Sequence, residues 1–372
     1  MPEVAGSSPV GRPMICLNAG DCCVTSNWGY PDFDAHESVH FFTDPASGLS
    51  AVIAIHSTAL GPAGGGVRFW RYAQPGDAIT DALRLSRGMS FKNAMAGLPM
   101  GGGKAVVLAD ADGRKTPEML KAFGRAIESL SGRYVTAEDV GMSDTDMVTI
   151  ASQTRHVSGL PVASGAAGGN PGPSTALGVY LGVKAAAEHG LGAASMAGVH
   201  VAIQGVGSVG GGLARLLAAD GARLTLADVN AERATALAAE LGADTARAEE
   251  ILSIAADIVS PNALGAILTE QSIADLQTTV VAGGANNQLA TPADGARLHA
   301  RGILYAPDYV INAGGIINVC LEYLGQGNRA EVEARIRKIP DRLVEIWGES
   351  AKTGMPIADV ADMIAKRLIG RG

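Results

Sequence analysis

The sequence is poor in aromatic residues and has no long apolar run. Aromatic side chains make up 4% of its 372 residues while hydrophobic residues make up 47%, so its core must be mainly aliphatic. A chain of this length is expected to form about two domains. No apolar run approaches the roughly 18 residues that a transmembrane helix needs, and no basic segment followed by a long apolar run marks a signal peptide. We therefore expect a cytoplasmic protein that does not enter a membrane.

Positive charge and cysteine are also scarce. Lys and Arg number 29 against 37 Asp and Glu, which gives a formal net charge of −8 at pH 7. An acidic chain without a long Lys/Arg run is a poor match for nucleic acid or for an anionic membrane surface. The cysteines have no framework spacing and form no CxxC motif, so reduced thiols in the cytoplasm are expected. They are Cys16, Cys22, Cys23 and Cys320.

Turn-rich segments divide the chain into regions. Residues 1–27 show no periodicity and predict a flexible leader, whereas helical and strand patterns alternate through 28–160. Glycine and proline crowd the junction near residue 160, and a second alternation fills 161–328. Residues 329–372 are helical in pattern, and we expect them to pack back towards the first domain. The fold class predicted is α/β with two domains.

The first region contains signals for individual elements. Asp77 is the expected N-cap of a helix, and Ser143 with Asp146 resembles a capping box. The glycines of 101–103 are expected to form a turn before a strand over 104–110. Another strand is expected to end at Asp139, where α/β folds place ligands.

The firmest motif is a GxGxxG sequence between a strand and a helix. Gly205 permits a tight turn, Gly207 lets backbone approach a pyrophosphate, and Gly210 lets helix and strand pack closely. Asp228 ends the next strand, 18 positions after the last glycine, and is placed to bind ribose hydroxyls and to repel a 2′-phosphate. The pattern favours NAD as the cofactor; the alternative is a tight turn without a ligand. The expected cofactor contacts are Gly205, Val206, Gly207, Ser208, Val209, Gly210 and Asp228.

Two lysines stand isolated in the apolar, glycine-rich stretch "FKNAMAGLPMGGGKAVV". Lys92 and Lys104 have no charged neighbours within several residues, in a chain with only 8 lysines. The simplest alternative is that both extend their ammonium groups into water. If they are buried, desolvation and a second nearby cation lower an ammonium pKa towards the range of a general base. One lysine would then hold an anion, the other would handle a proton, and Asp139 would hold a cationic amine or relay its proton.

Two other stretches resemble ligand-binding motifs, but their sequence context argues against both motifs. The stretch "HESVH", His36 to His40, matches the zinc-peptidase pattern, but it runs into a strand-like segment instead of lying on one helical face. We read these histidines as surface or strand-edge residues. The "LPMGGGKA" stretch is not a phosphate-binding Walker loop, because Leu98 and Ala105 occupy its required Gly and Ser/Thr positions. No metal is expected.

Long strings of this sequence resemble a known family. They are "LGPAGGGVR", "GMSFKNAMAGLPMGGGKAVV", "RYVTAEDVG", "IQGVGSVG", "AGGANNQL" and "LYAPDYVINAGGIINV". The chain resembles the Glu/Leu/Phe/Val amino acid dehydrogenases from about residue 29 onward, and is most similar to the leucine and phenylalanine enzymes. This resemblance implies a substrate and oligomerisation domain, a Rossmann-type domain and a cleft between them. It also implies a homo-oligomer that catalyses NAD-dependent, reversible oxidative deamination of an apolar L-amino acid to a 2-oxo acid and ammonium.

The resemblance also implies roles for individual residues. Lys92 would bind the substrate carboxylate with help from Asn286. Lys104 would have the lowered pKa and activate water, and Asp139 would hold the amino group and shuttle a proton. The other binding positions carried over, first for substrate and then for the coenzyme, are Gly65, Gly66, Asn312, Thr175 and Asn262.

The resemblance leaves the substrate side-chain pocket open. Leucine-type relatives carry leucine where Gly64 stands, so glycine there should widen the pocket, whereas Ile316 is bulkier than the usual residue and should narrow it. Met89 and Val319 are expected to line the same pocket. Differences of a few methylenes change specificity by only about 1–3 kcal/mol. Two alternatives remain open, a catalytically silent NAD-binding regulatory protein and a glutamate-type dehydrogenase.

Overall fold

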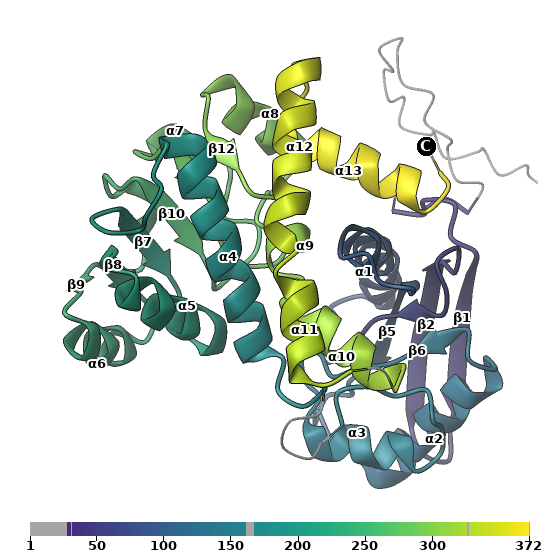
Figure 1. Cartoon of the computed structure of the whole chain (residues 1–372). Coiled ribbons are helices and arrows are strands. Elements are labelled where there is room, and N and C mark those ends of the chain that lie inside the picture. Colours follow the sequence, from purple (N-terminus) through teal and green to yellow (C-terminus); the bar gives the residue numbers. More distant parts are fainter. Residues whose placement is uncertain (1–27, 31, 161–166, 326, 372) are drawn as a thin grey trace, which may run out of the picture.

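A computed structural model describes residues 28–371 except Pro31, residues 161–166 and Gln326. The predicted leader, three of the cysteines and part of the predicted junction therefore lie outside the described residues. The described chain forms two lobes, each built on a six-stranded sheet (Figure 1). No helix in the described ranges is long and apolar enough to cross a membrane.

The first lobe is a mixed sheet with helices on both faces. Its strands run in the order β1-β2-β5-β3-β6, with β4 also paired to β5. Strands β1, β2 and β5 are antiparallel, whereas β3 and β4 run parallel to β5. Helix α1 covers one face, and α2 and α3 cover the other. The bounds are β1 Ser38–Asp44, β2 Leu49–Ser57, β3 Ala63–Gly64, β4 Val67–Trp70, α1 Pro75–Met95, β5 Gly101–Leu108, α2 Pro117–Ser129, β6 Tyr134–Val135 and α3 Asp144–Ala151.

The predicted glycine turn at 101–103 is wrong, because all three glycines belong to strand β5. A Cβ on Gly101 would lie 1.9 Å from the carbonyl oxygen of Ser57, and a Cβ on Gly102 would lie 2.0 Å from the backbone nitrogen of Ser90. A Cβ on Gly103 would meet the Tyr134 ring at 2.7 Å. The glycines therefore let this strand approach its neighbours and helix α1 more closely than any side chain allows.

Two boundaries also differ from the prediction. Helix α1 is capped by Gln74 and not by Asp77; Asp77 lies at the third helical position, where its carboxylate accepts from the Gln74 backbone N–H at 3.3 Å. The strand expected to end at Asp139 is only two residues long, and it continues as single bridges, one of them between Val67 and Glu138. The predicted capping box of Ser143 and Asp146 is confirmed.

The second lobe is a parallel sheet with the strand order of a dinucleotide-binding fold. The order β9-β8-β7-β10-β11-β12 corresponds to 3-2-1-4-5-6, and its switch point lies beside β7. Helices α4 and α5 pack against each other beside this sheet. The bounds are α4 Gly172–Leu191, β7 His200–Gln204, α5 Ser208–Ala219, β8 Arg223–Ala227, α6 Ala231–Leu241, β9 Asp244–Thr245, η1 Ile251–Ser253, β10 Ile258–Pro261, α7 Glu270–Asp275, β11 Val280–Val281, α8 Pro292–Ala300, β12 Leu304–Tyr305, α9 Asp308–Ile311 and α10 Gly314–Tyr323.

The C-terminal helices connect the two lobes. They are α11 Arg329–Ile336, α12 Ile339–Thr353 and α13 Ile357–Leu368. Helix α12 packs along α4 of the second lobe, whereas α13 packs on α1 of the first (Figure 1). The last described residue, Arg371, donates to the carbonyl oxygens of His56 at 2.6 Å and Asp34 at 2.9 Å. The end of the chain is thereby fixed to the first lobe.

Candidate active site

A cavity of about 400 Å³ lies between the two lobes and is lined by both of them. It lies at the carboxyl ends of the parallel strands, where α/β folds place ligands. Lys92, Lys104 and Asp139 line it from the first lobe, and Asn286 and Asn312 from the second. The two isolated lysines and the acidic residue at a strand end thus meet in one place.

Lys104 and Asp139 form a close ion pair inside this cavity. Lys104 stands in β5 and is 6% exposed, and its Nζ lies 2.6 Å from Asp139 Oδ2. Gly66 lets the backbone pass close to Asp139, because a Cβ on Gly66 would lie 2.8 Å from the Cβ of Asp139. Burial alone would raise the pKa of Asp139, but the positive charges of Lys104 and Arg68 outweigh it and lower that pKa. Asp139 is therefore an ionised carboxylate at neutral pH.

Lys92 connects the first lobe to the second. Its Nζ donates to Asn286 Oδ1 at 3.4 Å, and the same oxygen accepts from Asn312 Nδ2 at 2.8 Å. Burial lowers the pKa of Lys92 to about 8; the charge of Lys104 acts in the same direction, and that of Asp308 opposes it. The Lys92 amine is thus mainly protonated at neutral pH and loses its charge in mildly alkaline solution.

The glycine-rich turn forms a phosphate cradle beside the cavity. Gly205 has a φ of +83°, and a Cβ on Gly210 would lie 1.9 Å from the Gly205 carbonyl oxygen, so the helix starts directly against the strand. Among the described residues, and apart from its own chain neighbours, no atom lies within 4 Å of the position that a Cβ would take on Gly207. Helix α5 begins at Ser208 and presents its free N–H groups there. These residues fit a dinucleotide pyrophosphate.

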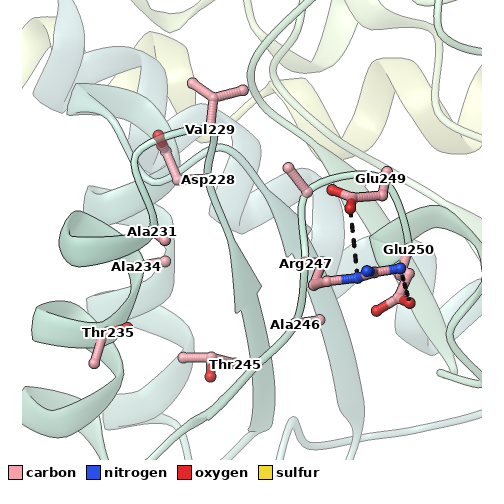
Figure 2. A pocket seen from close by; sticks show the side chains of 11 residues that line it. Asp228, Val229, Ala231, Ala234, Thr235, Thr245, Ala246, Arg247, Glu249 and Glu250 are labelled. Carbon is pink, nitrogen blue, oxygen red and sulfur yellow. Dashed lines mark hydrogen bonds and ion pairs between the residues drawn. The ribbon is translucent and has the colours of Figure 1, made fainter.

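A second pocket, of about 480 Å³, lies beyond the end of β8, between Asp228 and the segment 245–250. Figure 2 shows Asp228 and Val229 on one side of the pocket and Arg247 on the other. The Asp228 carboxylate accepts from the backbone N–H of Val206 and that of Asn230, each at 2.9 Å. Each of its oxygens keeps a second lone pair, so the carboxylate can still accept from ribose hydroxyls. Val206 itself is buried and supplies backbone.

The remaining predicted residues divide between the cavity and its surroundings. Met89, Thr175, Val209, Ile316 and Val319 line the cavity. Gly64 and Gly65 do not: side chains there would meet Met100 and the Gly103 carbonyl, respectively.

Asn262 lies behind the cavity wall. Its Oδ1 accepts from the Gly284 N–H at 2.8 Å, and its Nδ2 donates to the Ser260 carbonyl at 2.9 Å. The side chain therefore fixes the ends of two strands, while Gly284 forms part of the cavity lining. In this arrangement, Asn262 supports the lining through Gly284.

Several lining residues were missed by the sequence reasoning. Arg68 stands two residues after the last glycine of "GGGVR", and a charged residue in an otherwise apolar strand was a signal available in the sequence. Asp308 of "APDY" is a buried carboxylate, and burial raises its pKa. The hydrogen bond from the Gln288 backbone N–H and the charge of Lys92 act in the opposite direction but do not outweigh burial. The other lining residues not predicted include Leu85, Gly88, Gly169, Pro171 and Tyr309.

The histidines of "HESVH" are not presented together on a helix. His40 lies in strand β1, whereas His36 precedes that strand and is buried, with its Nε2 3.0 Å from Ser86 Oγ. The prediction of surface or edge histidines is therefore wrong for His36. Within the described ranges, no group of three or more His, Cys, Asp and Glu side chains is placed to hold a metal ion.

A parallel dinucleotide-binding sheet that opens onto a cavity with two amines and a carboxylate defines a dinucleotide-dependent dehydrogenase. Comparison with known proteins narrows this class. The model of the "Glu/Leu/Phe/Val dehydrogenase, dimerisation domain" matches residues 36–156, and that of "Glutamate/Leucine/Phenylalanine/Valine dehydrogenase" matches residues 225–368. The chain belongs to this family and is an amino acid dehydrogenase.

Individual relatives match over nearly the whole chain. A leucine dehydrogenase of Geobacillus stearothermophilus is 46% identical over 334 residues, which cover 90% of each chain. A valine dehydrogenase of Streptomyces virginiae is 46% identical over 341 residues, 91% of this chain and 95% of that one. Among solved structures, an L-tryptophan dehydrogenase from Nostoc punctiforme is 40% identical with a TM-score of 0.80, over 90% of this chain and 96% of that one.

Proposed function

We propose that the protein catalyses the NAD-dependent, reversible oxidative deamination of an apolar L-amino acid to its 2-oxo acid and ammonium. The observation that carries this proposal is that Lys92, Lys104 and Asp139 face one cavity, beside the glycine turn that fits a dinucleotide. The named relatives, which are leucine and valine dehydrogenases, support the same class of substrate.

The two lysines divide the work of binding and chemistry. Lys92 binds the substrate carboxylate, and Asn286, held in turn by Asn312, supports it. Asp139 accepts hydrogen bonds from the substrate amino group and removes its extra proton. Bound NAD supplies the acceptor for the hydride that leaves the substrate Cα. The backbone beside Gly66 and the walls of the cavity hold the substrate and exclude water during this transfer.

Hydrolysis of the resulting imine requires an activated water molecule. Lys104, 2.6 Å from Asp139, orients this water and, in its neutral form, takes a proton from it as the oxygen attacks the imine carbon. Asp139 then returns its proton to the nitrogen and takes the hydroxyl proton as the C–N bond breaks and the carbonyl forms. Ammonia accepts that proton from Asp139 and leaves as ammonium, and Lys104 releases its proton to solvent. The reverse sequence is reductive amination. The same two groups thus hold every proton that the reaction moves.

The lining of the cavity favours an apolar side chain on the substrate. Met89, Ile316 and Val319 line it from both lobes. The basic residues in the described lining are Lys92, Lys104 and Arg68, and Arg68 already lies within 4 Å of two carboxylates. A glutamate side chain would therefore find no uncommitted cation, which disfavours the glutamate-type alternative.

The second pocket favours NAD over NADP. The Asp228 carboxylate lines the place where the adenine ribose follows from the glycine turn, and a 2′-phosphate would meet its negative charge. Arg247 in the same pocket is paired with Glu249 at 3.4 Å and with Glu250 at 2.6 Å. These glutamates offset the cation that would otherwise attract a phosphate.

We also propose that the protein forms a homo-oligomer and is located in the cytoplasm. The matched model of residues 36–156 is that of a dimerisation domain, which supports a homo-oligomer built through the first lobe. Cys320, the cysteine within the described residues, is a free, buried thiol, as expected of a protein in the cytoplasm.

A substrate panel tests the proposal. Purified protein is mixed with NAD and leucine, valine, phenylalanine, tryptophan or glutamate at alkaline pH, and absorbance is followed at 340 nm. We expect turnover with apolar substrates and little with glutamate. Lys104→Ala should lose turnover by at least about a hundredfold, as for loss of a general base, and keep NAD affinity by calorimetry. Flat traces from the unmodified protein across the panel would favour a silent NAD-binding protein.

A further inference from the structure

Arg68 connects the proposed active site to a buried polar network behind it. The residue stands in β4, directly after the glycine segment, and its side chain lines the cavity. Its Nη1 donates to Asp81 Oδ2 at 2.6 Å, and its Nε lies 3.5 Å from Asp139 Oδ2. The Nε is buried and has no hydrogen-bond partner among the described residues. One guanidinium therefore lies between two carboxylates.

Asp81 fixes the far side of this guanidinium. Its side chain is only 10% exposed and accepts from Tyr72 Oη at 2.5 Å and from Arg84 Nη2 at 3.1 Å, besides Arg68. These three donors leave Asp81 little freedom. Because guanidinium is planar and its N–H groups point in fixed directions, holding one edge on Asp81 directs the Nε–H edge towards Asp139.

Both cations beside Asp139 act on the same oxygen. Lys104 Nζ is 2.6 Å and Arg68 Nε 3.5 Å from Oδ2. A carboxylate with one oxygen held by two cations has a fixed orientation. Its other oxygen is then available to a substrate amino group.

We propose that Arg68 is a positioning residue that orients the Asp139 carboxylate for catalysis, with Asp81 as its anchor. The proposal rests on the function proposed above, in which Asp139 carries the proton of the substrate amine. Arg68 acts through Asp139 and contacts neither substrate nor coenzyme in this role.

The charges around Asp139 give the direction of the effect. Burial raises the pKa of Asp139, whereas Lys104 and Arg68 lower it, so loss of Arg68 moves this pKa upwards. The other titratable groups that act on Asp139 are Lys92, Tyr134 and Glu138. A substitution of Arg68 leaves these three groups in place. A carboxylate that must be ionised to accept a proton then works only at higher pH.

Arg68→Met tests the proposal in the full-length enzyme through the pH profile of kcat/KM. We expect the acidic limb to move to higher pH and kcat at the optimum to fall about ten- to a hundredfold, the scale of a misplaced catalytic group. Arg68→Lys should restore part of the shift, because it keeps the charge without the planar fork. Asp81→Asn should move the limb in the same direction by a smaller amount.

Arg84→Ala is the matched control. Arg84 also binds Asp81, but its side chain is 54% exposed and it has no contact with Asp139 in the described structure. Its pH profile should match that of the unmodified enzyme. An Arg68→Met profile that keeps its acidic limb while kcat falls would overturn the proposal and assign Arg68 a merely structural role.

A crystal structure of Arg68→Met separates this proposal from the proposed function. We expect the Asp139 carboxylate to rotate away from Lys104 or to lose its order. A carboxylate unchanged in position would overturn the positioning role even if the enzyme turned over amino acids normally. Absence of turnover in the unmodified protein would instead end the proposed function, and the crystal structure would still decide whether Arg68 orients Asp139.

Discussion

Replacement of Lys92 by arginine should remove a pH dependence from carboxylate binding. Lys92 Nζ lies 3.4 Å from Asn286 Oδ1 in the cavity between the lobes. Burial lowers the pKa of Lys92 to about 8; Asp308 opposes this effect and Lys104 adds to it. A ligand carboxylate binds the charged amine, so its affinity is highest below pH 8 and is lost as the pH rises above that value.

The magnitude follows from the protonated fraction of Lys92. For a ligand that binds only the charged form, the apparent Kd is the intrinsic Kd divided by that fraction. With a pKa of about 8, Kd rises about tenfold at pH 9 and about a hundredfold at pH 10, relative to its value at low pH. Each pH unit in this range weakens binding by about 1.4 kcal/mol. Arginine stays charged throughout, so the variant should show a flat profile.

Calorimetry with 4-methylpentanoate provides the assay. This carboxylate lacks the amino group of leucine, so its own charge is constant from pH 6 to 10 and the slope reports on the protein. Asn286→Ala is a useful control, because it removes the neighbour of Lys92 while keeping the amine: affinity should fall and the slope should remain. A Kd that is constant from pH 6 to 10 in the unmodified protein, or a slope that persists in Lys92→Arg, would refute this reasoning.

Two further substitutions test the packing and the coenzyme pocket. Gly102→Ala places a Cβ 2.0 Å from the Ser90 backbone nitrogen of α1. This clash should lower the free energy of unfolding by about 1–3 kcal/mol. Gly348→Ala is the control, because a Cβ at residue 348 of α12 lies in open space and should not lower the free energy of unfolding. Denaturant unfolding measures both. Glu249→Gln combined with Glu250→Gln frees Arg247 and should strengthen 2′-AMP binding about tenfold or more by calorimetry, as for a new hydrogen bond to a charged group. An unchanged 2′-AMP affinity would contradict the role given to this pair.

The sequence predicted the second lobe better than the first. Strand, glycine turn, helix and Asp228 follow one another locally, so the pattern alone placed each of them correctly in the Rossmann-type sheet. In the first lobe, β5 pairs with strands from three other parts of the chain. The extended conformation of residues 101–103 depends on those distant neighbours, and a local pattern reads three glycines as a turn.

A candidate site residue could be predicted where its type differs from that of its neighbours in the sequence. Lys92 and Lys104 were conspicuous as cations in an apolar stretch, and Asp139 as an acid near a strand end. Asp308 became recognisable only through the charge that it faces across the fold, and the contact of Arg68 with Asp139 appears only in the structure. Gly64 was predicted to shape the substrate pocket, but the sequence does not show in which direction a side chain there would point. In this structure a Cβ on Gly64 would point at Met100 and not into the cavity.

In the segment from Lys92 to Lys104, the same residues determine both the packing of the first lobe and the placement of the two amines. Helix α1 ends shortly after Lys92, and the chain returns as β5, so two amines twelve residues apart face the same cavity. That return is possible only because Gly102 lets β5 lie against the α1 backbone at Ser90. A side chain at residue 102 would push apart the helix that carries Lys92 and the strand that carries Lys104. The glycines are therefore required both for packing the sheet and for setting the separation of the two amines that the proposed mechanism uses.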